Sequence, residues 1–462
     1  MNYTIESTGG LSQLLRLRRD PLAYIADVGR RSVDVRCLRF GPRRVFQVNH
    51  PDLIRDVLVT HDWNFVKDQV LRASKPILGY GLLTSEGELH RRQRRLVQPA
   101  FHSARLASYA QVMVECAEAT GRSWSSGERY AIDKEMMSLT LQIVGRTLFS
   151  ADLKQDAAGV GESLTRVLGL FLQLNSPIAQ MLFPIRKLAE RKAARSRREI
   201  AQVLGNVIED HRRHPDAYDD MLSMLMRSHD DTNAGYMSDE LLLDESLTLF
   251  LAGHETTANA LTWTWCLLAR NPDAADRLHA ELKCVLNGRL PTLDDLPLLN
   301  YTGKIFREVL RLYPPAWIIG REAVTDYQLG GVSVPAGSTL LMSPYATHRD
   351  PRFWDNPEEF NPDRWTEGSS SIRPKFAFYP FGAGTRVCVG EHFAMMEGVL
   401  LIATLAQQWQ FDLAPGQTVK PWPQITLRPR RSIFFHLKHR SCDGQRVDSS
   451  QELSTESPGR SV

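Results

Sequence analysis

The chain of 462 residues lacks several features, and each absence argues against a class of protein. Its six cysteines form no CxxC pair and no short disulfide-rich module, a usage typical of a reducing compartment. An excess of one charge is also missing, because the formal net charge is +3, so nothing indicates a nucleic-acid-binding protein. With 43% hydrophobic and 24% charged residues, and neither a linker nor an internal repeat, the sequence predicts one globular protein with a large core.

A long uninterrupted apolar run is absent as well. The N-terminal segment MNYTIESTGGLSQLLRLRRD contains none, so we expect neither a signal peptide nor a membrane anchor, and a cytoplasmic location. The most apolar stretch, residues 241–265, includes Asp244, Glu245, His254 and Glu255, which would be costly in lipid. This stretch therefore predicts a buried helix.

Helical periodicity is the dominant pattern, from about Glu88 to Leu282. The segments VDVRCLRF and RVFQVN, around a Gly41-Pro42 turn, predict a hairpin near the N-terminus. After Pro314 the chain is richer in proline and glycine, with a strand-and-turn pattern and the long loop DPRFWDNPEEFNPDRW. Residues 441–462 are polar and aperiodic, and we expect a disordered tail there.

The longest helix candidate runs from Asp239 to Arg270, with Ser238 as its expected N-cap. Its middle is unusual, because the small residue Ala252 is followed by the acid Glu255 and the hydroxyl of Thr256. Thr256 can bond back to the carbonyl of Ala252 and open or bend the helix, so that water or a small ligand could enter. A kinked helix with a satisfied polar pair is the alternative.

An acid and a base stand three residues apart in YTGKIFREVLRLYPPA and so share one face of a short helix. Glu308 and Arg311 would ordinarily form a surface ion pair of small value. Apolar neighbours indicate that the pair is partly buried, and a buried arginine needs further partners. Arg364, in NPDRW, is the candidate third member.

A lone cysteine lies among glycines in YPFGAGTRVCVG, residues 379–390, just before a predicted helix over 391–405. Backbone amides and the helix dipole would stabilise a thiolate at Cys388, and Arg386 could pair with an anionic ligand. Three interpretations stay open: an inert buried cysteine, a nucleophile, or an axial ligand to haem iron. His392 is the nearest candidate base, but Cys388 with His392 supplies at most two of the four ligands that zinc prefers.

Four segments together resemble the cytochrome P-450 family. FGAGTRVCVG matches every fixed position of the haem-loop pattern F-x-x-G-x-R-x-C-x-G, namely Phe381, Gly384, Arg386, Cys388 and Gly390. AGHETT resembles the oxygen-activating helix motif, EVLR resembles the E-x-x-R pair, and FNPDRW resembles the segment that supplies the third member of that pair's triad. The motifs follow the family's order and spacing, and the similarity in layout spans about residues 20–438.

The resemblance implies a mainly α fold with small β-sheets, in which residues 1–440 form one haem domain and a long central helix crosses haem b. Cys388 would be the proximal iron ligand, and Thr256 and Glu255 would organise water and deliver protons. Glu308, Arg311 and Arg364 would be structural.

The haem carboxylates need cations, which the resemblance assigns to His90, Arg94, Arg321 and Arg386. ELHRRQRRLVQPAF resembles the family's C-helix, although many members have tryptophan at the position of His90. Ala252 and Phe381 would complete the haem contacts. A solvated surface charge is the alternative for each arginine.

The chain has no Rossmann fingerprint and no cysteine cluster, so electrons would come from a ferredoxin and its NAD(P)H-dependent reductase. Arg91, Arg92 and Arg95 could form a basic patch that attracts such an acidic partner. The expected reaction inserts one atom of O2 into a hydrophobic molecule such as a fatty acid or terpenoid. The pair Glu255-Thr256 argues against two alternatives, a peroxide-dependent enzyme and a non-catalytic haem sensor or carrier.

The expected substrate pocket draws on the loop before His90, on Thr248 to Ala252 and on Trp317 to Ile319. These segments are mostly apolar. The alternative for Trp317 is that it packs in the core.

Overall fold

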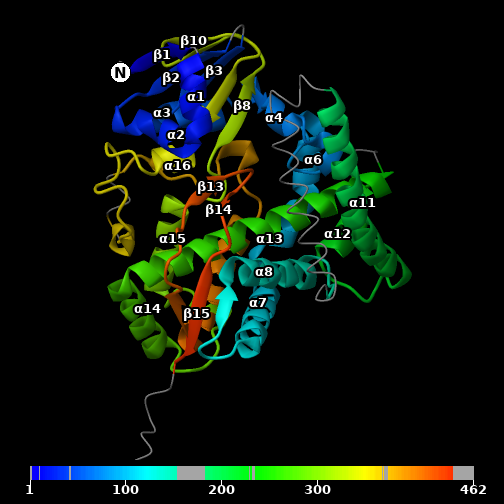
Figure 1. Ribbon diagram of the computed structural model, residues 1–462. Coiled ribbons are helices and arrows are strands. Elements are labelled where there is room, and N and C mark those ends of the chain that lie inside the picture. Colours follow the sequence, from blue (N-terminus) through cyan, green and yellow to red (C-terminus); the bar gives the residue numbers. More distant parts are fainter. Residues whose placement is uncertain are drawn as a thin grey trace, which may run out of the picture.

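The computed structural model describes residues 3–9, 11–40, 43–152, 183–227, 229–230, 235–366, 368 and 373–440. Helices dominate and the sheets are small, as expected (Figure 1). The main helices are α1 (Leu11–Arg19), α2 (Pro21–Arg30), α3 (Pro51–Arg55), α6 (Gly87–Val97), α7 (Ser103–Ser123), α8 (Ile132–Leu148), α11 (Phe183–Arg213), α12 (Met221–Arg227), α13 (Asp239–Arg270), α14 (Pro272–Val285), α15 (Asn300–Leu312), α16 (Pro344–Thr347) and α18 (Glu391–Gln408). The predicted tail, 441–462, lies outside the described residues.

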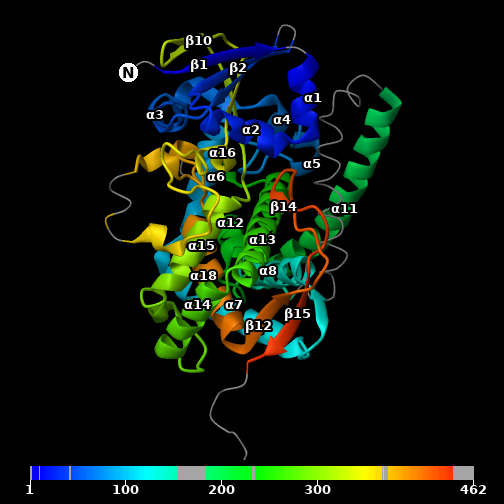
Figure 2. The same cartoon turned by 60° about the vertical axis from the view of Figure 1, so that its left-hand side comes forward.

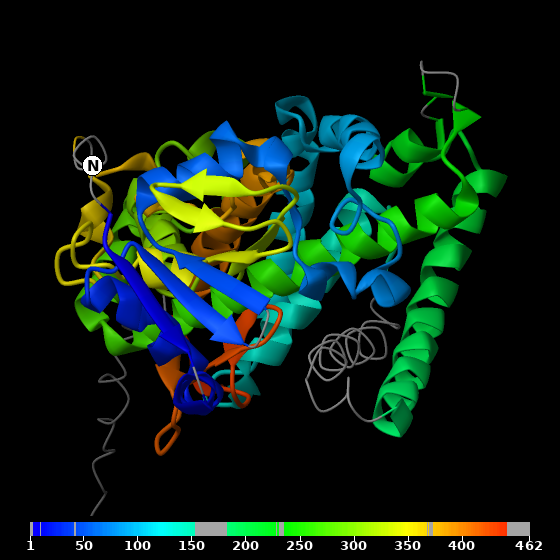
Figure 3. The ribbon, with the colours of Figure 1, turned by 90° about the horizontal axis from the view of Figure 1, so that it is seen from above.

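One sheet joins segments that are far apart in the sequence. Its order is β1 (Ile5–Gly9), β2 (Val35–Phe40), β3 (Arg43–Val48), β11 (Thr339–Met342), β8 (Ile319–Ala323) and β4 (Phe65–Lys67). Strands β2 and β3 pair antiparallel, which confirms the predicted hairpin. The antiparallel register of β4 and β8 sets Lys67 opposite Arg321, so two cations become neighbours. Seen from above, the blue and yellow strands lie on one side of the molecule and the green α11 on the other (Figure 3).

Smaller sheets complete the strand set. One contains β5 (Arg129–Ala131), β12 (Trp409–Leu413) and β15 (Phe434–His439). Three hairpins pair β6 (His229–Asp230) with β7 (Gly235–Tyr236), β9 (Tyr327–Leu329) with β10 (Val332–Val334), and β13 (Pro421–Pro423) with β14 (Leu427–Pro429). The β13–β14 hairpin approaches α13, and this contact bears on the site below.

Helix α13 crosses the middle of the molecule, and α8, α15 and α18 pack against it (Figures 1 and 2). The Ser238 hydroxyl accepts the Leu241 amide at 3.3 Å, which confirms the predicted N-cap. The helix is continuous over its 32 residues. Two of its acids, Asp244 and Glu245, are buried and bonded to backbone, since Asp244 accepts from the Tyr80 amide and Glu245 from the Leu82 amide.

The buried polar residues of α13 confirm a core helix. Within the part of the chain that the structure describes, no helix combines the length and the hydropathy that crossing a bilayer demands.

Candidate functional site

The cysteine loop is closed by its own backbone before α18 begins. The Cys388 amide donates to the Phe381 carbonyl at 2.9 Å, across a short 3-10 turn, Gly384–Arg386. Gly390 is the N-cap residue of α18. The loop therefore fixes Cys388 at the start of a helix, as the sequence predicts.

Gly384 is required by geometry. It has a φ of +69°, and a Cβ built there would lie 1.9 Å from the Leu58 carbonyl oxygen. We expect Gly384→Ala to lower the free energy of unfolding by about 3 kcal/mol or more, because both the backbone and the contact are violated. Gly416 has a similar φ of +74° with no atom within 4 Å of its Cβ position, so Gly416→Ala should cost only about 1 kcal/mol. Chemical denaturation measures the free energy of unfolding of both variants. Equal losses would contradict the claim that the contact with Leu58 makes Gly384 necessary.

Cys388 is exposed although it lies on an interior loop. Desolvation by the surrounding protein atoms raises the pKa of the Cys388 thiol, while the Gly390 amide lowers it. The amide at the helix start thus favours the thiolate, as the sequence predicts, and desolvation opposes it. A metal cation bound to the sulfur would stabilise the thiolate further, and the exposed position of Cys388 suits that ligand role.

The middle of α13 is open on one face only. Ala252 is exposed and Thr256 half-buried, whereas Leu251 and Glu255, the residues that precede each of them, are buried. The Thr256 hydroxyl donates to the Ala252 carbonyl at 2.8 Å, as predicted, yet the helix does not break. An exposed small residue in a core helix, like the exposed sulfur, is what a flat cofactor packed between helix and loop would cover.

Glu255 does not share the open face with Thr256. Its Oε1 accepts a hydrogen bond from the hydroxyl of Thr426, just before β14, at 2.5 Å. The same oxygen forms an ion pair with Arg428, which lies within β14. Asn259 joins the same cluster by donating to the Thr426 hydroxyl at 3.2 Å. Glu255 is thus bonded to the β13–β14 hairpin, whereas Thr256 lies on the open face of α13.

The predicted cations gather in one cluster, which Lys67 joins. Burial, and then repulsion by Arg386, lowers the pKa of Lys67 to about 7, of His90 to about 3 and of Arg321 to about 10. The repulsion shows that the cluster holds more positive charge than its surroundings compensate. Sequence reasoning missed Lys67, because a single lysine after a short strand gives no signal until β4 pairs with β8.

The cluster also touches the cysteine loop directly. Arg94 donates to the Val387 carbonyl at 2.7 Å, next to Cys388. Arg386 donates to the Ser85 carbonyl at 2.8 Å and pairs with Glu86. A ligand with two carboxylates would offset the excess charge, so these residues fit the propionates of haem.

The Glu308 cluster is fully buried. Glu308 and Arg311 have no exposed surface and form two bonds, at 2.8 and 2.9 Å. Arg364 Nε donates to Glu308 at 3.1 Å, and the Trp365 indole donates at 3.0 Å. Arg311 reaches three further carbonyls, those of His348, Pro357 and Glu359. The predicted triad is present and belongs to the core.

For Trp317 the structure favours the alternative that it packs in the core. Trp317 is buried in the apolar cluster under α2, and its indole donates to the Gln424 carbonyl at 2.7 Å. Ile319 differs, because its side chain lies near the Gly382 position of the cysteine loop.

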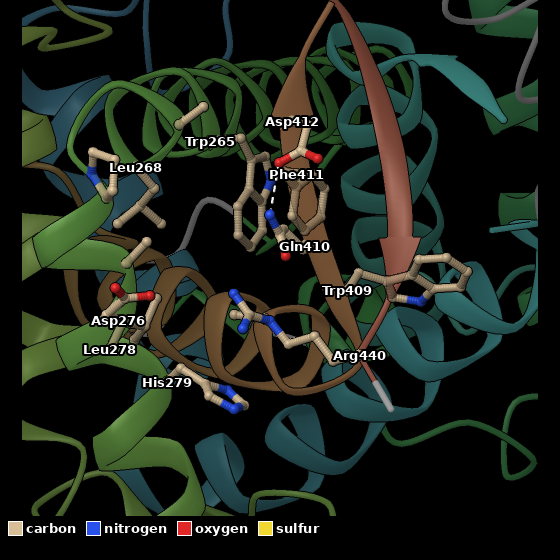
Figure 4. Close-up of a pocket in the computed structure, with 14 residues that line it drawn as sticks. Trp265, Leu268, Asp276, Leu278, His279, Trp409, Gln410, Phe411, Asp412 and Arg440 are labelled. Carbon is tan, nitrogen blue, oxygen red and sulfur yellow. Dashed lines mark hydrogen bonds between the residues drawn. The ribbon is translucent and has the colours of Figure 1, made fainter. Parts of the chain in front are cut away.

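A separate pocket of about 160 Å³ opens at the far end of α13 (Figure 4). It lies among α13, α14, α18 and β12, and Arg440 extends into it beside His279 and Gln410. It shares no residue with the cysteine loop or with the open face of α13, so it is distinct from the candidate site.

Fold and site together fit a haem-binding protein in which Cys388 would be the iron ligand. The family model Cytochrome P-450 matches residues 8–435, and the chain belongs to this family. A crystal structure of a cytochrome P-450 haem domain superimposes with a TM-score of 0.85 over 96% of this chain and 98% of the other, at 24% identity, and this supports the fold.

Curated relatives cover nearly the whole chain. Cyclooctatin synthase of Streptomyces melanosporofaciens is 40% identical over 91% of this chain and 92% of its own length. Cyclooctat-9-en-7-ol 5-monooxygenase of the same organism is 35% identical over 88% and 89%. Pentalenene oxygenase of Streptomyces avermitilis is 36% identical over 92% and 94%. The protein is therefore a cytochrome P-450 monooxygenase, and its cofactor is haem b.

Proposed function

We propose that this enzyme hydroxylates a cyclic terpenoid hydrocarbon or alcohol. The observation that carries the proposal is the similarity, over about nine-tenths of the chain, to three oxygenases whose names denote terpenoid substrates or products. The apolar run Leu249–Leu251 beside the open Ala252 is compatible with a hydrocarbon substrate. Titration with a sesquiterpene, a cyclic diterpene alcohol and a fatty acid, followed by the haem spin-state shift, tests it. A response to the fatty acid alone would contradict the proposal.

The described residues divide the work around the cofactor. Cys388 would hold the iron, and the haem carboxylates would be held by Lys67, His90, Arg94, Arg321 and Arg386. When bound, haem supplies the activation of O2, which the thiolate ligand favours. Phe381 supports the loop through its carbonyl, and Ala252 leaves room on the helix. Thr256 holds water on the open face of α13, while Glu255 anchors the neighbouring hairpin.

Thr256→Ala is expected to uncouple the enzyme, lowering product formed per NADPH consumed by about fivefold to tenfold, because the hydroxyl that orders water is lost. Thr262 is the matched control, since it makes the same bond to a carbonyl four residues earlier, at 2.8 Å, inside the core. Thr262→Ala should keep its coupling. The measurement is the yield of peroxide and of product with NADPH and redox partners. Coupled turnover by Thr256→Ala would contradict the role of Thr256 in ordering water.

We further propose that electrons arrive from a ferredoxin, served by an NAD(P)H-dependent reductase. The side chains of Arg91 and Arg95 are 71% and 63% exposed on α6, the helix that contacts the cysteine loop through Arg94. Both also approach Glu88, which reduces the net charge of the patch. Stoichiometric NADPH consumption with these partners would also distinguish a monooxygenase from a peroxide-dependent enzyme or a haem sensor.

A further inference from the structure

Positive charge is concentrated in the first part of the chain. Residues 1–48 contain nine arginines and four acids, whereas the whole chain has a formal net charge of +3. Residues 49–462 are therefore slightly acidic. Six of the nine arginines are exposed and form no ion pair with the residues that the structure describes, namely Arg16, Arg18, Arg19, Arg30, Arg39 and Arg44. We call these six residues the basic surface.

The acids of residues 1–48 do not compensate the basic surface. Three of them form ion pairs with other arginines, namely Glu6 and Asp27 with Arg31 and Arg36, and Asp34 with Arg352. The fourth, Asp20, accepts the Ala23 amide at 3.0 Å and so caps α2. The basic surface therefore carries positive charge that no described carboxylate pairs with, and such a surface attracts anions.

The tertiary structure gathers the basic surface on one side of the molecule. Helix α1 packs on α2 and on β1. Arg39 lies opposite Gly9, the last residue of β1, and opposite Arg44 on its other side. Like charges directly opposite each other in a sheet are destabilising, and an anionic partner relieves that repulsion. Figure 2 shows α1 at the edge of the molecule, next to the ends of the blue strands.

A cleft of about 260 Å³ lies between α1 and α2. Its charged lining residues are Arg16, Arg19, Arg30, Asp20 and Asp27. The two acids are already engaged, so the three arginines remain available to an anion. Arginine binds the oxygens of a phosphate group through paired N–H groups. The cleft therefore fits a phosphate group.

The outward face of α1 adds an apolar side chain to these cations. Leu17 packs against the core cluster under α2, whereas Leu15, on the opposite side of the helix, is 57% exposed. Arg18 and Arg19 follow Leu15 by three and four residues, so they share its face. An exposed leucine flanked by arginines is typical of a helix that lies in the head-group region of a bilayer. A free phosphate ion would use the cleft but not the leucine.

We propose that the basic surface docks the enzyme on a lipid bilayer that contains anionic phospholipids. Arg16, Arg19 and Arg30 bind lipid phosphates at the cleft, and Leu15 enters the head-group region. Each arginine near an anionic bilayer contributes to binding. Docking itself does not depend on the substrate. It also brings the enzyme to a place where apolar terpenoids dissolve, a consequence that rests on the proposed function.

Cosedimentation of the haem-loaded enzyme with vesicles tests the proposal. At about 0.1 M salt, vesicles of phosphatidylglycerol and phosphatidylcholine should bind the enzyme about tenfold more tightly than phosphatidylcholine vesicles. The double variant Arg18→Glu and Arg19→Glu should remove that preference, because it reverses the charge on the outward face of α1. Leu15→Ser should weaken binding to the anionic vesicles by about threefold without a change in charge. Both variants should keep haem and the red-shifted carbon monoxide band.

The double variant Arg270→Glu and Lys283→Glu is the matched control, because it changes the net charge by the same amount. Both side chains are exposed and form no ion pair with described residues. They lie on α13 and α14, and α14 lies at the opposite end of the molecule from α1 (Figures 1 and 2). This variant should bind the anionic vesicles within about twofold of the wild type. An equal loss of binding in this control would overturn the proposal.

Two further outcomes would also overturn it. Equal binding of the wild type to both kinds of vesicle would exclude a role for lipid charge. Absence of vesicle binding, together with a raised KM for ferredoxin in the Arg18→Glu and Arg19→Glu variant, would assign the basic surface to an acidic protein. Because vesicle binding is measured without substrate, neither outcome affects the terpenoid proposal, and a fatty-acid response in the spin-state titration leaves docking intact.

Discussion

Replacing Cys388 with serine is expected to remove monooxygenase activity, by about a thousandfold or more, while the fold persists. A neutral hydroxyl is a poor substitute for the thiolate, whose electron donation favours O–O cleavage. The carbonyl acceptor at Phe381 and the N-cap at Gly390 involve backbone atoms, so they survive the substitution. The reduced protein with carbon monoxide should lose its strongly red-shifted Soret band.

Cys284 is the control for this experiment. It is a free, exposed cysteine on α14, outside the cysteine loop. Cys284→Ser should keep both the band and the activity. A red-shifted band in Cys388→Ser would mean that another residue ligates the iron, and the site assignment would have to be withdrawn.

Glu308→Gln is expected to destabilise the protein by about 3–5 kcal/mol and to lower haem retention. The substitution leaves Arg311 fully buried without its counter-charge, which costs far more than loss of an exposed ion pair. Arg364 and the Trp365 indole donate to different oxygens of Glu308, and glutamine keeps only one of them, so the loop over residues 355–366 loses part of its anchor. Denaturant unfolding and haem content measure both effects.

The exposed pair of Arg277 and Asp363 offers the comparison. Its two bonds of 2.8 Å have good geometry, but both side chains are about half exposed. Arg277→Ala should therefore cost about 1 kcal/mol or less. Similar losses in Arg277→Ala and Glu308→Gln would show that burial does not set the value of the Glu308 cluster.

The features of the site that the sequence predicted depend on contacts between residues that are close in the chain. The thiol and its glycines lie within ten residues, Ser238 caps its own helix, and Thr256 bonds one turn back. Glu308 and Arg311 are one helical turn apart. Such contacts depend on spacing along one element, which the order of residues fixes.

Contacts between distant segments were not predicted from the sequence. Glu255 remains the expected partner of Thr256, and the tertiary structure adds its ion pair with Arg428, 173 residues later. Trp317 was expected in the pocket, but Gln424 binds its indole in the core. Lys67 joined the cation cluster only through the pairing of β4 with β8.

The sequence by itself determined the candidate ligand cysteine, the central helix and the family, because each rests on residue types at short fixed spacings. The tertiary structure decided which charges are paired. It coupled Glu255 to a hairpin and concentrated the cations around the cysteine loop. The physical reason is that desolvation and ion pairing depend on the three-dimensional surroundings of a group, which only the packed chain defines.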